Sequence, residues 1–292
     1  MPRLIDHLVL CVRDLDRAAR VYERLGFTLT PRAAHPWGTG NHLAQFGRNF
    51  LELLGLDDPA RIPEPKQGEF GFGAFNRDFL ERREGMSMLV FEGRDAEADR
   101  AAFARAGLGD FARFDFSRDA KLPDGGTARV GFSLVFAARP DWREAAFFTC
   151  QQHAPEHFWK PAFQRHANTA RGVVEVVMAA ADPGAHADWF ARLTGLGAEA
   201  VEGGFTCAAE APDGLMSRVA VLAPAAVKAR WPEARVIDAT PHFVGFRIQV
   251  ADRAAAQRTM SAGEVPFREA AGGVLIVPPD FAFGCVIEFA AG

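Results

Sequence analysis

Ile5-Asp6-His7-Leu8-Val9-Leu10-Cys11-Val12 begins the stretch, residues 4–56, from which the fold can be inferred. This run is rich in Leu and Val and predicts a buried strand. Asp14 then stands where an N-cap is expected, and Gly26 where the following helix should end. Turn residues separate three further predicted strands, at residues 27–30, 41–46 and 50–54. The stretch therefore predicts a strand, a helix and three more strands.

The same order of strand, aspartate, helix and glycine recurs along the chain, which is the signature of an internal repeat. The aspartates and the glycines that follow them at nearly equal intervals are Asp14 and Gly26, Asp95 and Gly107, Asp182 and Gly195, and Asp252 and Gly263. One such unit has a single helix, so it leaves one face of its sheet uncovered and needs a partner. We therefore predict an α+β protein of four βαβββ modules, paired into two half-barrel domains at residues 1–165 and 170–292.

Two connections interrupt this pattern. Residues 57–85 form a long segment that is first Pro-rich and then rich in Phe and Gly. A connection of this length usually has a role, here a cleft wall or lid, and the alternative is a surface insertion. In the second module, Pro123-Asp124-Gly125-Gly126 predicts the turn of a hairpin.

Composition restricts the class of partner. The 292 residues carry a net charge of −4, and the basic side chains are scattered singly, so we expect a small-molecule ligand and no nucleic acid. No apolar run approaches the length of a membrane span, and Met1-Pro2-Arg3 leads directly into the first strand, which favours a cytoplasmic protein without a membrane partner. A homodimer remains open. The four cysteines are far apart and suggest neither a zinc ribbon nor a disulfide scaffold.

The first module carries a metal-binding side chain on its first strand, His7, and another on its last, Glu52. Burying an ionised glutamate costs roughly several kcal/mol of folding free energy unless a cation or hydrogen-bond donors compensate the charge. A metal shared with His7 would supply that compensation. The alternative is a Glu52 paired with an arginine and a His7 hydrogen-bonded in the core.

Repeated modules with His on the first strand and Glu on the last resemble the vicinal oxygen chelate superfamily, which includes glyoxalase I, extradiol dioxygenases and bleomycin-resistance proteins. The resemblance covers nearly the whole chain as modules. Three segments resemble the bacterial glyoxalase-like domain branch of this superfamily: residues 35–41, 75–79 and 147–153. The resemblance implies a divalent metal in the cleft between paired modules, bound by side chains from their first and fourth strands and chelated by substrate oxygens.

Carried over to this chain, the pattern is only partly present. His7 and Glu52 match it, but Met88 stands at the histidine position of the second module, and a thioether is a poor ligand for a hard cation. The last strand of that module offers Cys150, Gln151, Gln152 or His153 instead of a glutamate. We predict His153 as the third ligand, with a structural or substrate-binding histidine as the alternative.

In the second half, the same alignment places Glu175 and Gly245 at the histidine positions, and Glu288 recovers the last-strand carboxylate. We interpret this half as a structural pair of modules, with an oxygen-rich site at Glu175 and Glu288 as the alternative. His153 to His157 also fits an H-x-x-E-H zinc motif. We regard the match as accidental, because Pro155 cannot lie inside the helix that the motif requires.

Polar and aromatic side chains near these ligands are predicted to bind the substrate, because ligand sites combine an apolar wall with a few polar groups. They come from the loop and strand after the first helix, from the long connection, and from the polar stretch after the second module: His35, Trp37, Asn41, His42, Phe75, Asn76, Arg77, Gln151, Glu156, Trp159 and His166. The residues from the polar stretch after the second module could equally belong to a joint between the two domains.

We therefore predict a metal-dependent lyase, isomerase or dioxygenase that acts on a small oxygenated organic molecule. Fe, Mn, Ni or Zn would be bound by His7, Glu52 and His153, with Glu52 also catalytic, and the metal would stabilise negative charge on a substrate oxygen. The alternative is a metal-free protein that binds or sequesters a small molecule, as bleomycin-resistance proteins do, and Met88 and Gly245 favour it. A scaffold whose cleft is filled by side chains is a third option.

Overall fold

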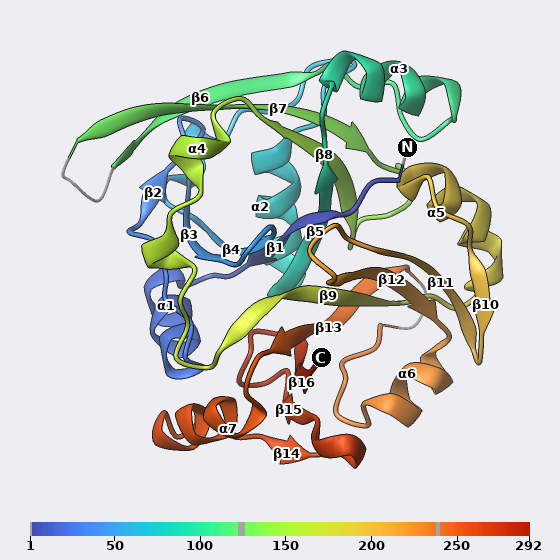
Figure 1. Ribbon diagram of the computed structural model, residues 1–292. Coiled ribbons are helices and arrows are strands. Elements are labelled where there is room, and N and C mark those ends of the chain that lie inside the picture. Colours follow the sequence, from blue (N-terminus) through green and yellow to red (C-terminus); the bar gives the residue numbers. More distant parts are fainter. Residues whose placement is uncertain (1, 122–125, 238–239) are drawn as a thin grey trace.

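The computed structural model describes residues 2–121, 126–237 and 240–292, whose strands form two eight-stranded mixed sheets. The first sheet has the order β2-β3-β4-β1-β5-β8-β7-β6 and curls into a half-barrel (Figure 1). The second has the corresponding order β10-β11-β12-β9-β13-β16-β15-β14. The predicted α+β fold of four paired modules is confirmed. Residues 122–125, which include most of the expected hairpin turn, lie outside the described part of the chain.

Each module follows the predicted order of one strand, one helix and three strands. The first two modules consist of β1 (Ile5–Cys11), α1 (Leu15–Arg24), β2 (Ala33–Ala34), β3 (Thr39–Gln45) and β4 (Phe50–Leu56), then β5 (Gly85–Glu92), α3 (Ala96–Arg105), β6 (Phe114–Lys121), β7 (Thr127–Ala137) and β8 (Ala146–Gln152). The last two consist of β9 (Ala170–Ala179), α5 (Ala187–Thr194), β10 (Glu199–Val201), β11 (Gly204–Glu210) and β12 (Met216–Leu222), then β13 (His242–Val250), α7 (Arg253–Ala262), β14 (Arg268–Glu269), β15 (Leu275–Val277) and β16 (Val286–Ala291).

Further helices lie between these elements. They are α2 (Phe72–Arg82), α4 (Pro155–Phe158) and α6 (Pro224–Arg230), with 3-10 turns at Pro59–Arg61, Pro161–Phe163, Gly184–His186 and Ala271–Gly273. None of the helices in the described ranges is long and apolar enough to cross a lipid bilayer.

Aspartate caps begin the module helices as predicted in three of the modules. Asp14, Asp95 and Asp252 each accept a hydrogen bond from the backbone N–H three residues later, at 2.8, 3.0 and 3.0 Å. In the third module Asp182 instead accepts from Ala185 N at 3.3 Å, ahead of the 3-10 turn that precedes α5.

One predicted strand is misplaced. Residues 27–30 are not in a strand, and the short edge strand β2 begins only at Ala33. Thr28 explains the difference, because its N–H donates to His166 Nδ1 and its hydroxyl donates to Arg165 O. Long-range hydrogen bonds to the stretch after the second module therefore replace the expected strand pairing.

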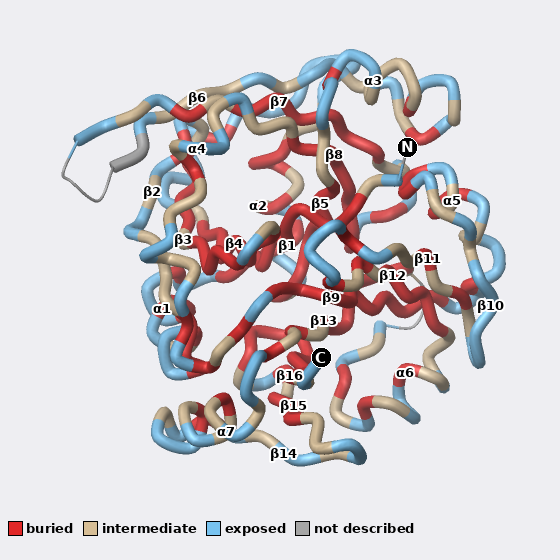
Figure 2. The backbone as a smooth tube through the Cα atoms, viewed as in Figure 1, coloured by how far each residue is buried: buried red, intermediate tan, exposed pale blue. Residues whose placement is uncertain are grey.

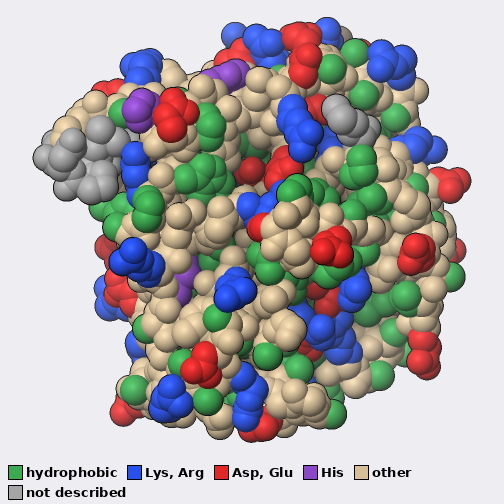
Figure 3. Space-filling view, viewed as in Figure 1, with side chains coloured by type: hydrophobic (Ala, Val, Ile, Leu, Met, Phe, Trp, Pro, Cys, Tyr) green, Lys and Arg blue, Asp and Glu red, His purple; other side chains and the backbone are tan. Residues whose placement is uncertain are grey.

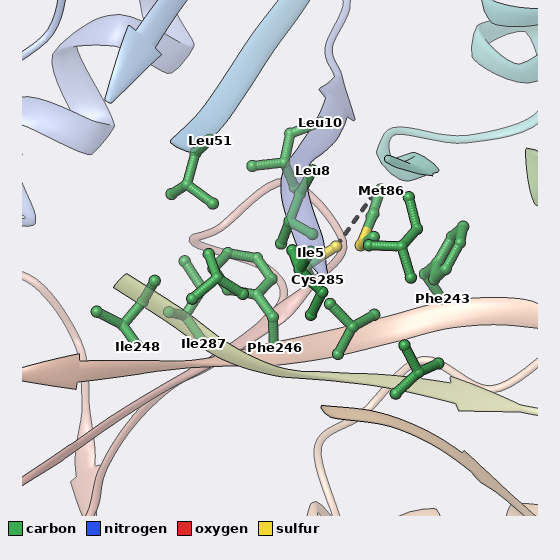
Figure 4. Packing of buried hydrophobic residues seen from close by; sticks show 14 of the residues in the cluster. Ile5, Leu8, Leu10, Leu51, Met86, Phe243, Phe246, Ile248, Cys285 and Ile287 are labelled. Atoms are coloured by element: carbon green, nitrogen blue, oxygen red, sulfur yellow. Dashed lines mark hydrogen bonds between the residues drawn. The ribbon is translucent and has the colours of Figure 1, made fainter. Parts of the chain in front are cut away.

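The two sheets pack back to back through apolar side chains (Figure 4). Leu8 and Leu10 of β1 face this interface, where they join Phe246 of β13 and Ile287 of β16 in one core. Met86 N also donates to Cys285 Sγ across it, at 3.2 Å. Figure 2 shows that these central strands are the buried part of the chain, while the outer helices are largely exposed on one side.

The opposite face of the first sheet encloses α2, which lies within the curve of the half-barrel (Figure 1). Phe79 of α2 is fully buried there and packs in one cluster with Val9 and Met88. The segment 57–85 therefore supplies a packed wall of the half-barrel. Because side chains alternate along a strand, His7 and Val9 point to this enclosed face while Leu8 and Leu10 point to the other sheet.

Candidate functional site

A cavity lies on the enclosed face of the first sheet. Its empty volume, including the part open to solvent, is about 480 Å³. Its walls are largely aromatic, formed by Trp37, Phe50, Phe72, Phe116, Phe132, Phe148 and Phe158. The polar side chains among its lining residues are His7, His35, Asn41, Glu52 and Arg118. A few convergent polar groups in an apolar hollow are typical of a small-molecule site.

His7 lies on β1 and is held in a defined orientation. Its Nδ1 is 2.6 Å from Asp6 Oδ2, and Asp6 Oδ1 accepts a hydrogen bond from Gln152 Nε2 at 3.2 Å. The Phe50 ring stacks on the imidazole at a centroid distance of 4.2 Å. A carboxylate on one ring nitrogen fixes the tautomer and leaves the other free as a ligand. That other nitrogen, Nε2, is 3.7 Å from Glu52 Oε2.

Glu52, on β4, is a buried carboxylate with few compensating contacts. Its side chain is 8% exposed, and its Oε1 accepts a hydrogen bond from Asn41 Nδ2 at 2.6 Å. Within the described residues it forms no ion pair with a lysine or an arginine. Asn41 Oδ1 is also buried and has no hydrogen-bond partner. The arginine-paired glutamate considered as an alternative from the sequence is therefore not what the structure shows.

His35 completes a cluster around Glu52, with its Nε2 4.0 Å from Glu52 Oε1. Thr39 Oγ1 bonds to its Nδ1 at 2.8 Å, and Trp37 stacks on the ring at 4.8 Å. Burial lowers the pKa of His35 below its ordinary value, despite the opposing effect of Glu52. The imidazole is therefore neutral at pH 7, the form that can bind a metal or accept a proton.

Arg118, on β6, was not predicted as a site residue, although it lines the cavity. Burial lowers the pKa of its guanidinium, and the attraction of Glu52 opposes that shift. Arginine nevertheless stays charged in proteins. One signal in the sequence could have found it: Phe114, Phe116 and Arg118 alternate with polar residues, so a strand would place all three on one face.

His153 was predicted beside His7 and Glu52, but the structure separates them. It follows the end of β8, and its Nε2 lies 2.8 Å from Ser133 Oγ in another, open pocket. Strand register explains this. Val9 pairs with Glu52 in the first module and Val90 pairs with Phe148 in the second, so Phe148 occupies the position equivalent to Glu52.

Other predicted substrate-binding residues have structural contacts outside the cavity. Gln151 Oε1 accepts from Ala96 N at the start of α3, and His42 Nδ1 lies 2.8 Å from Thr30 O. His166 donates from Nε2 to Gln45 O at 2.7 Å and accepts from Thr28 N. None of these three side chains lines the cavity.

The remaining ones also lie away from the cavity lining. Asn76 is buried in α2, where it donates to Phe72 O and accepts from Ser87 Oγ. Phe75 packs on Phe70, Arg77 forms ion pairs with Glu64 and Asp78, Glu156 is exposed, and Trp159 packs against Phe50 and Phe158. The structure thus gathers His7, His35, Trp37, Asn41 and Glu52, and leaves the others elsewhere.

The chemistry of the gathered donors suits a divalent cation, since two imidazoles and one carboxylate form a common metal-binding set. In the described parts of the chain, however, no three His, Cys, Asp or Glu side chains are grouped so that they could hold a metal ion. The Asn41 amide lies among these side chains, with Nδ2 2.6 Å from Glu52 Oε1 and 3.4 Å from His35 Nε2. Its Oδ1 has no hydrogen-bond partner among the described residues, and an amide oxygen is an atom type that can bind a metal.

The family profile described as a glyoxalase-like domain matches residues 5–194, which is more than half of the chain. The chain belongs to this glyoxalase-like family. The vicinal oxygen chelate superfamily inferred from the modules is thereby confirmed. Among curated proteins, none matches the chain.

Solved structures show the same fold over the whole glyoxalase-like chain. A hypothetical protein from Staphylococcus aureus has a TM-score of 0.62 at 13% identity, covering 99% of both chains. A mutant 4-hydroxymandelate synthase from Streptomyces coelicolor has a TM-score of 0.55 at 12% identity, covering 100% of this chain and 93% of its own. The Mn(II)-bound glyoxalase from Novosphingobium aromaticivorans has a TM-score of 0.52 at 13% identity, covering 100% and 83%. At these identities the likeness shows the fold alone.

Proposed function

We propose that this glyoxalase-like protein is a metal-dependent enzyme, a lyase, isomerase or dioxygenase, whose site lies in the first pair of modules, residues 1–165. Its substrate is a small oxygenated organic molecule. The observation that carries the proposal is the buried Glu52 carboxylate, which faces two imidazole nitrogens at 3.7 and 4.0 Å and forms no ion pair with any arginine or lysine that the structure describes. A buried charge of this kind needs a cation.

In this proposal His7, His35 and Glu52 hold a divalent metal, Fe, Mn, Ni or Zn, with Asn41 as a fourth polar neighbour. When bound, such a metal acts as a Lewis acid for negative charge on a substrate oxygen. Asp6 keeps His7 Nε2 directed into the cavity. The neutral His35 and the carboxylate of Glu52 can each accept a proton from the substrate. The aromatic walls exclude water, which strengthens these electrostatic interactions.

The test is the metal content of purified protein, expressed with added Fe, Mn, Ni or Zn and measured by elemental analysis. We expect stoichiometric metal in the wild type and its loss in Glu52→Gln, which keeps the shape of the side chain but removes its charge. Glu288→Gln, in the second half, is the matched control and should retain the metal. A wild type that contains no metal after all four additions would contradict the proposal.

A metal-free binding protein is the second candidate, favoured by the Asn41 amide that donates to Glu52. Met88 and Phe148, which occupy the ligand positions of the second module by register, cannot replace the missing donors. This candidate predicts that the cavity binds its ligand equally well before and after treatment with a chelator. The enzyme predicts that binding falls when the metal is removed.

A further inference from the structure

Arg118 lies where the cavity meets a second, outer pocket. The two hollows share Leu43, Arg118 and Phe158 as lining residues, so the outer pocket leads toward the cavity. In the part of the chain that the structure describes, the Arg118 side chain makes no hydrogen bond and no ion pair, while its backbone pairs with Val130 in the sheet. A charged guanidinium with five N–H donors is thus left without an acceptor at the entrance of an apolar hollow.

The Arg118 side chain is part-buried, and its guanidinium is available to a ligand. Burial lowers the pKa of Arg118, which means that its charged form is poorly solvated, and the attraction of Glu52 offsets only part of that effect. The planar fork of a guanidinium matches a carboxylate, which can accept two parallel hydrogen bonds from it.

The charges near the entrance also favour an anion. Arg32, in the outer pocket, is neutralised by ion pairs with Asp16 and Asp57. Lys160 donates to the backbone oxygen of Glu156 and, within the described residues, has no acidic partner. Asp119 is the acidic residue in this lining. A divalent cation at Glu52 would add to this positive balance deeper in the cavity.

The walls between Arg118 and His7 define the rest of the ligand. Phe116 and Phe132 stack at a centroid distance of 5.0 Å, and Trp37 meets Phe116 edge-on at 4.9 Å. Arg118 is the cationic side chain among the described lining residues. A single guanidinium balances the one negative charge of a carboxylate but not the charge of about −1.5 to −2 on a phosphate group.

The geometry points to an organic acid with an aromatic or short apolar body as the ligand of this cavity. Its carboxylate binds Arg118, its body lies along Phe116 and Phe132, and an oxygenated far end reaches His7 and Glu52. The assignment of the far end rests on the proposed metal-dependent function. The assignment of the carboxylate depends on Arg118 alone.

The experiment compares two probes of nearly the same shape, phenylacetate and phenylacetamide, by calorimetric titration of the Mn-supplemented protein. We expect the wild type to bind the acid at least about tenfold more tightly than the amide, as for a charge-assisted hydrogen bond. Arg118→Gln should reduce acid binding to the level of the amide and leave amide binding unchanged. Arg118→Lys, which keeps the charge but not the fork, should show an intermediate preference.

Arg32→Gln is the matched control, because Arg32 lines the outer pocket but is already paired; it should keep the preference of the wild type. The inference is overturned if wild type binds acid and amide alike, if it binds neither, or if Arg118→Gln and Arg118→Lys weaken both probes equally. Elemental analysis of the same samples separates the two proposals. A preference for the acid without bound metal contradicts the enzyme only, and bound metal without the preference contradicts this inference only.

Discussion

The two halves of the molecule use the same strand order but treat the equivalent hollow in opposite ways. In the first half, Glu52 faces the imidazoles of His7 and His35 and accepts a hydrogen bond from the Asn41 amide. In the second, Glu288 accepts hydrogen bonds from Arg230, Arg247 and Trp231 Nε1, each at 2.7 Å. Arg230 also bonds to Glu175, at 2.6 Å. A guanidinium therefore stands in the second half where a metal is proposed in the first.

The pKa shifts agree with this contrast. Burial raises the pKa of Glu288, but Arg230 and Arg247 outweigh burial and lower it. Burial lowers the pKa of Arg230, and its bonds to Glu288 and Glu175 more than reverse the effect. The oxygen-rich site considered for Glu175 and Glu288 is thus already supplied with a cation by the protein itself. The structure favours the interpretation of this half as a structural pair of modules.

Trp231 packs in the core of the second half, where its Nε1 donates to Glu288. It is fully buried, and a Cβ at Gly245 would lie only 2.8 Å from Trp231 Cζ3. Gly245 stands at the histidine position of the fourth module, which Met88 occupies in the second, so the absence of a side chain there makes room for the indole. The difference shows that a cavity in this fold depends on a few side chains, because the backbone scaffold is common to both halves. Four predictions test this difference between the two halves.

The largest expected effect is that of Trp231→Ala. Replacing a fully buried tryptophan usually costs about 3–5 kcal/mol, because a cavity is left and packing is lost. Here Glu288 would also lose one of its donors. Urea unfolding of this variant and of Trp37→Ala in the first cavity should show a clearly smaller loss for Trp37, since its surroundings are already open. Equal losses would mean that both hollows are equally packed.

Arg230→Met should cost about 3 kcal/mol of unfolding free energy, because removing one partner of a buried ion pair leaves uncompensated charge. Glu175 would then keep only longer contacts with Arg218 and Arg247, both at 3.8 Å. The measurement is again urea unfolding, with Arg235→Met on the exposed Arg235–Asp280 pair as the control. An Arg230→Met protein as stable as the control would show that the network contributes little.

A matched pair of carboxylate variants tests the comparison directly. In metal-free protein, Glu288→Gln should cost about 2 kcal/mol, because two charge-assisted hydrogen bonds are weakened. Glu52→Gln should leave the melting temperature unchanged or raise it, since a neutral amide replaces a buried carboxylate that forms no ion pair with a described arginine or lysine. Thermal melts in the presence of a chelator measure both. A destabilised Glu52→Gln would show that the hydrogen bond from Asn41 already compensates the carboxylate.

The smallest effect is the dependence of stability on pH. Burial lowers the pKa of His35 in the first half and of His242 in the second, so both are neutral in the folded protein. Below the unfolded value of about 6.5 the unfolded chain takes up protons that the folded chain does not, and stability falls by up to about 1.4 kcal/mol per pH unit for each group. Thermal melts between pH 7.5 and 5.5 should show this decline. His35→Gln and His242→Gln should each flatten it, and a wild type insensitive to pH in that range would contradict the assignment.

Part of the site could be predicted because the signals are local. His7 and Glu52 lie on strands recognised from short apolar runs, and Asp14, Asp95 and Asp252 cap helices through bonds that span only three residues. The position of Met88 also followed, by counting back from Asp95. Figure 3 shows basic and acidic side chains interspersed over one face of the molecule, which is the scattered charge that the sequence implied.

The sequence by itself therefore determined the modules, their order and their pairing, since apolar strands, caps and repeats act over a few residues. Only the tertiary structure decided which residues line the cavity. Phe148 rather than His153 stands opposite Glu52 because of the pairing of β5 with β8, which no local signal specifies. Arg118 and His35 line the same cavity as Glu52 because the sheet curls, and Arg230 bonds to Glu175 in the other half because α6 ends there. These are contacts between residues far apart in the chain, and their geometry depends on the packing of whole elements.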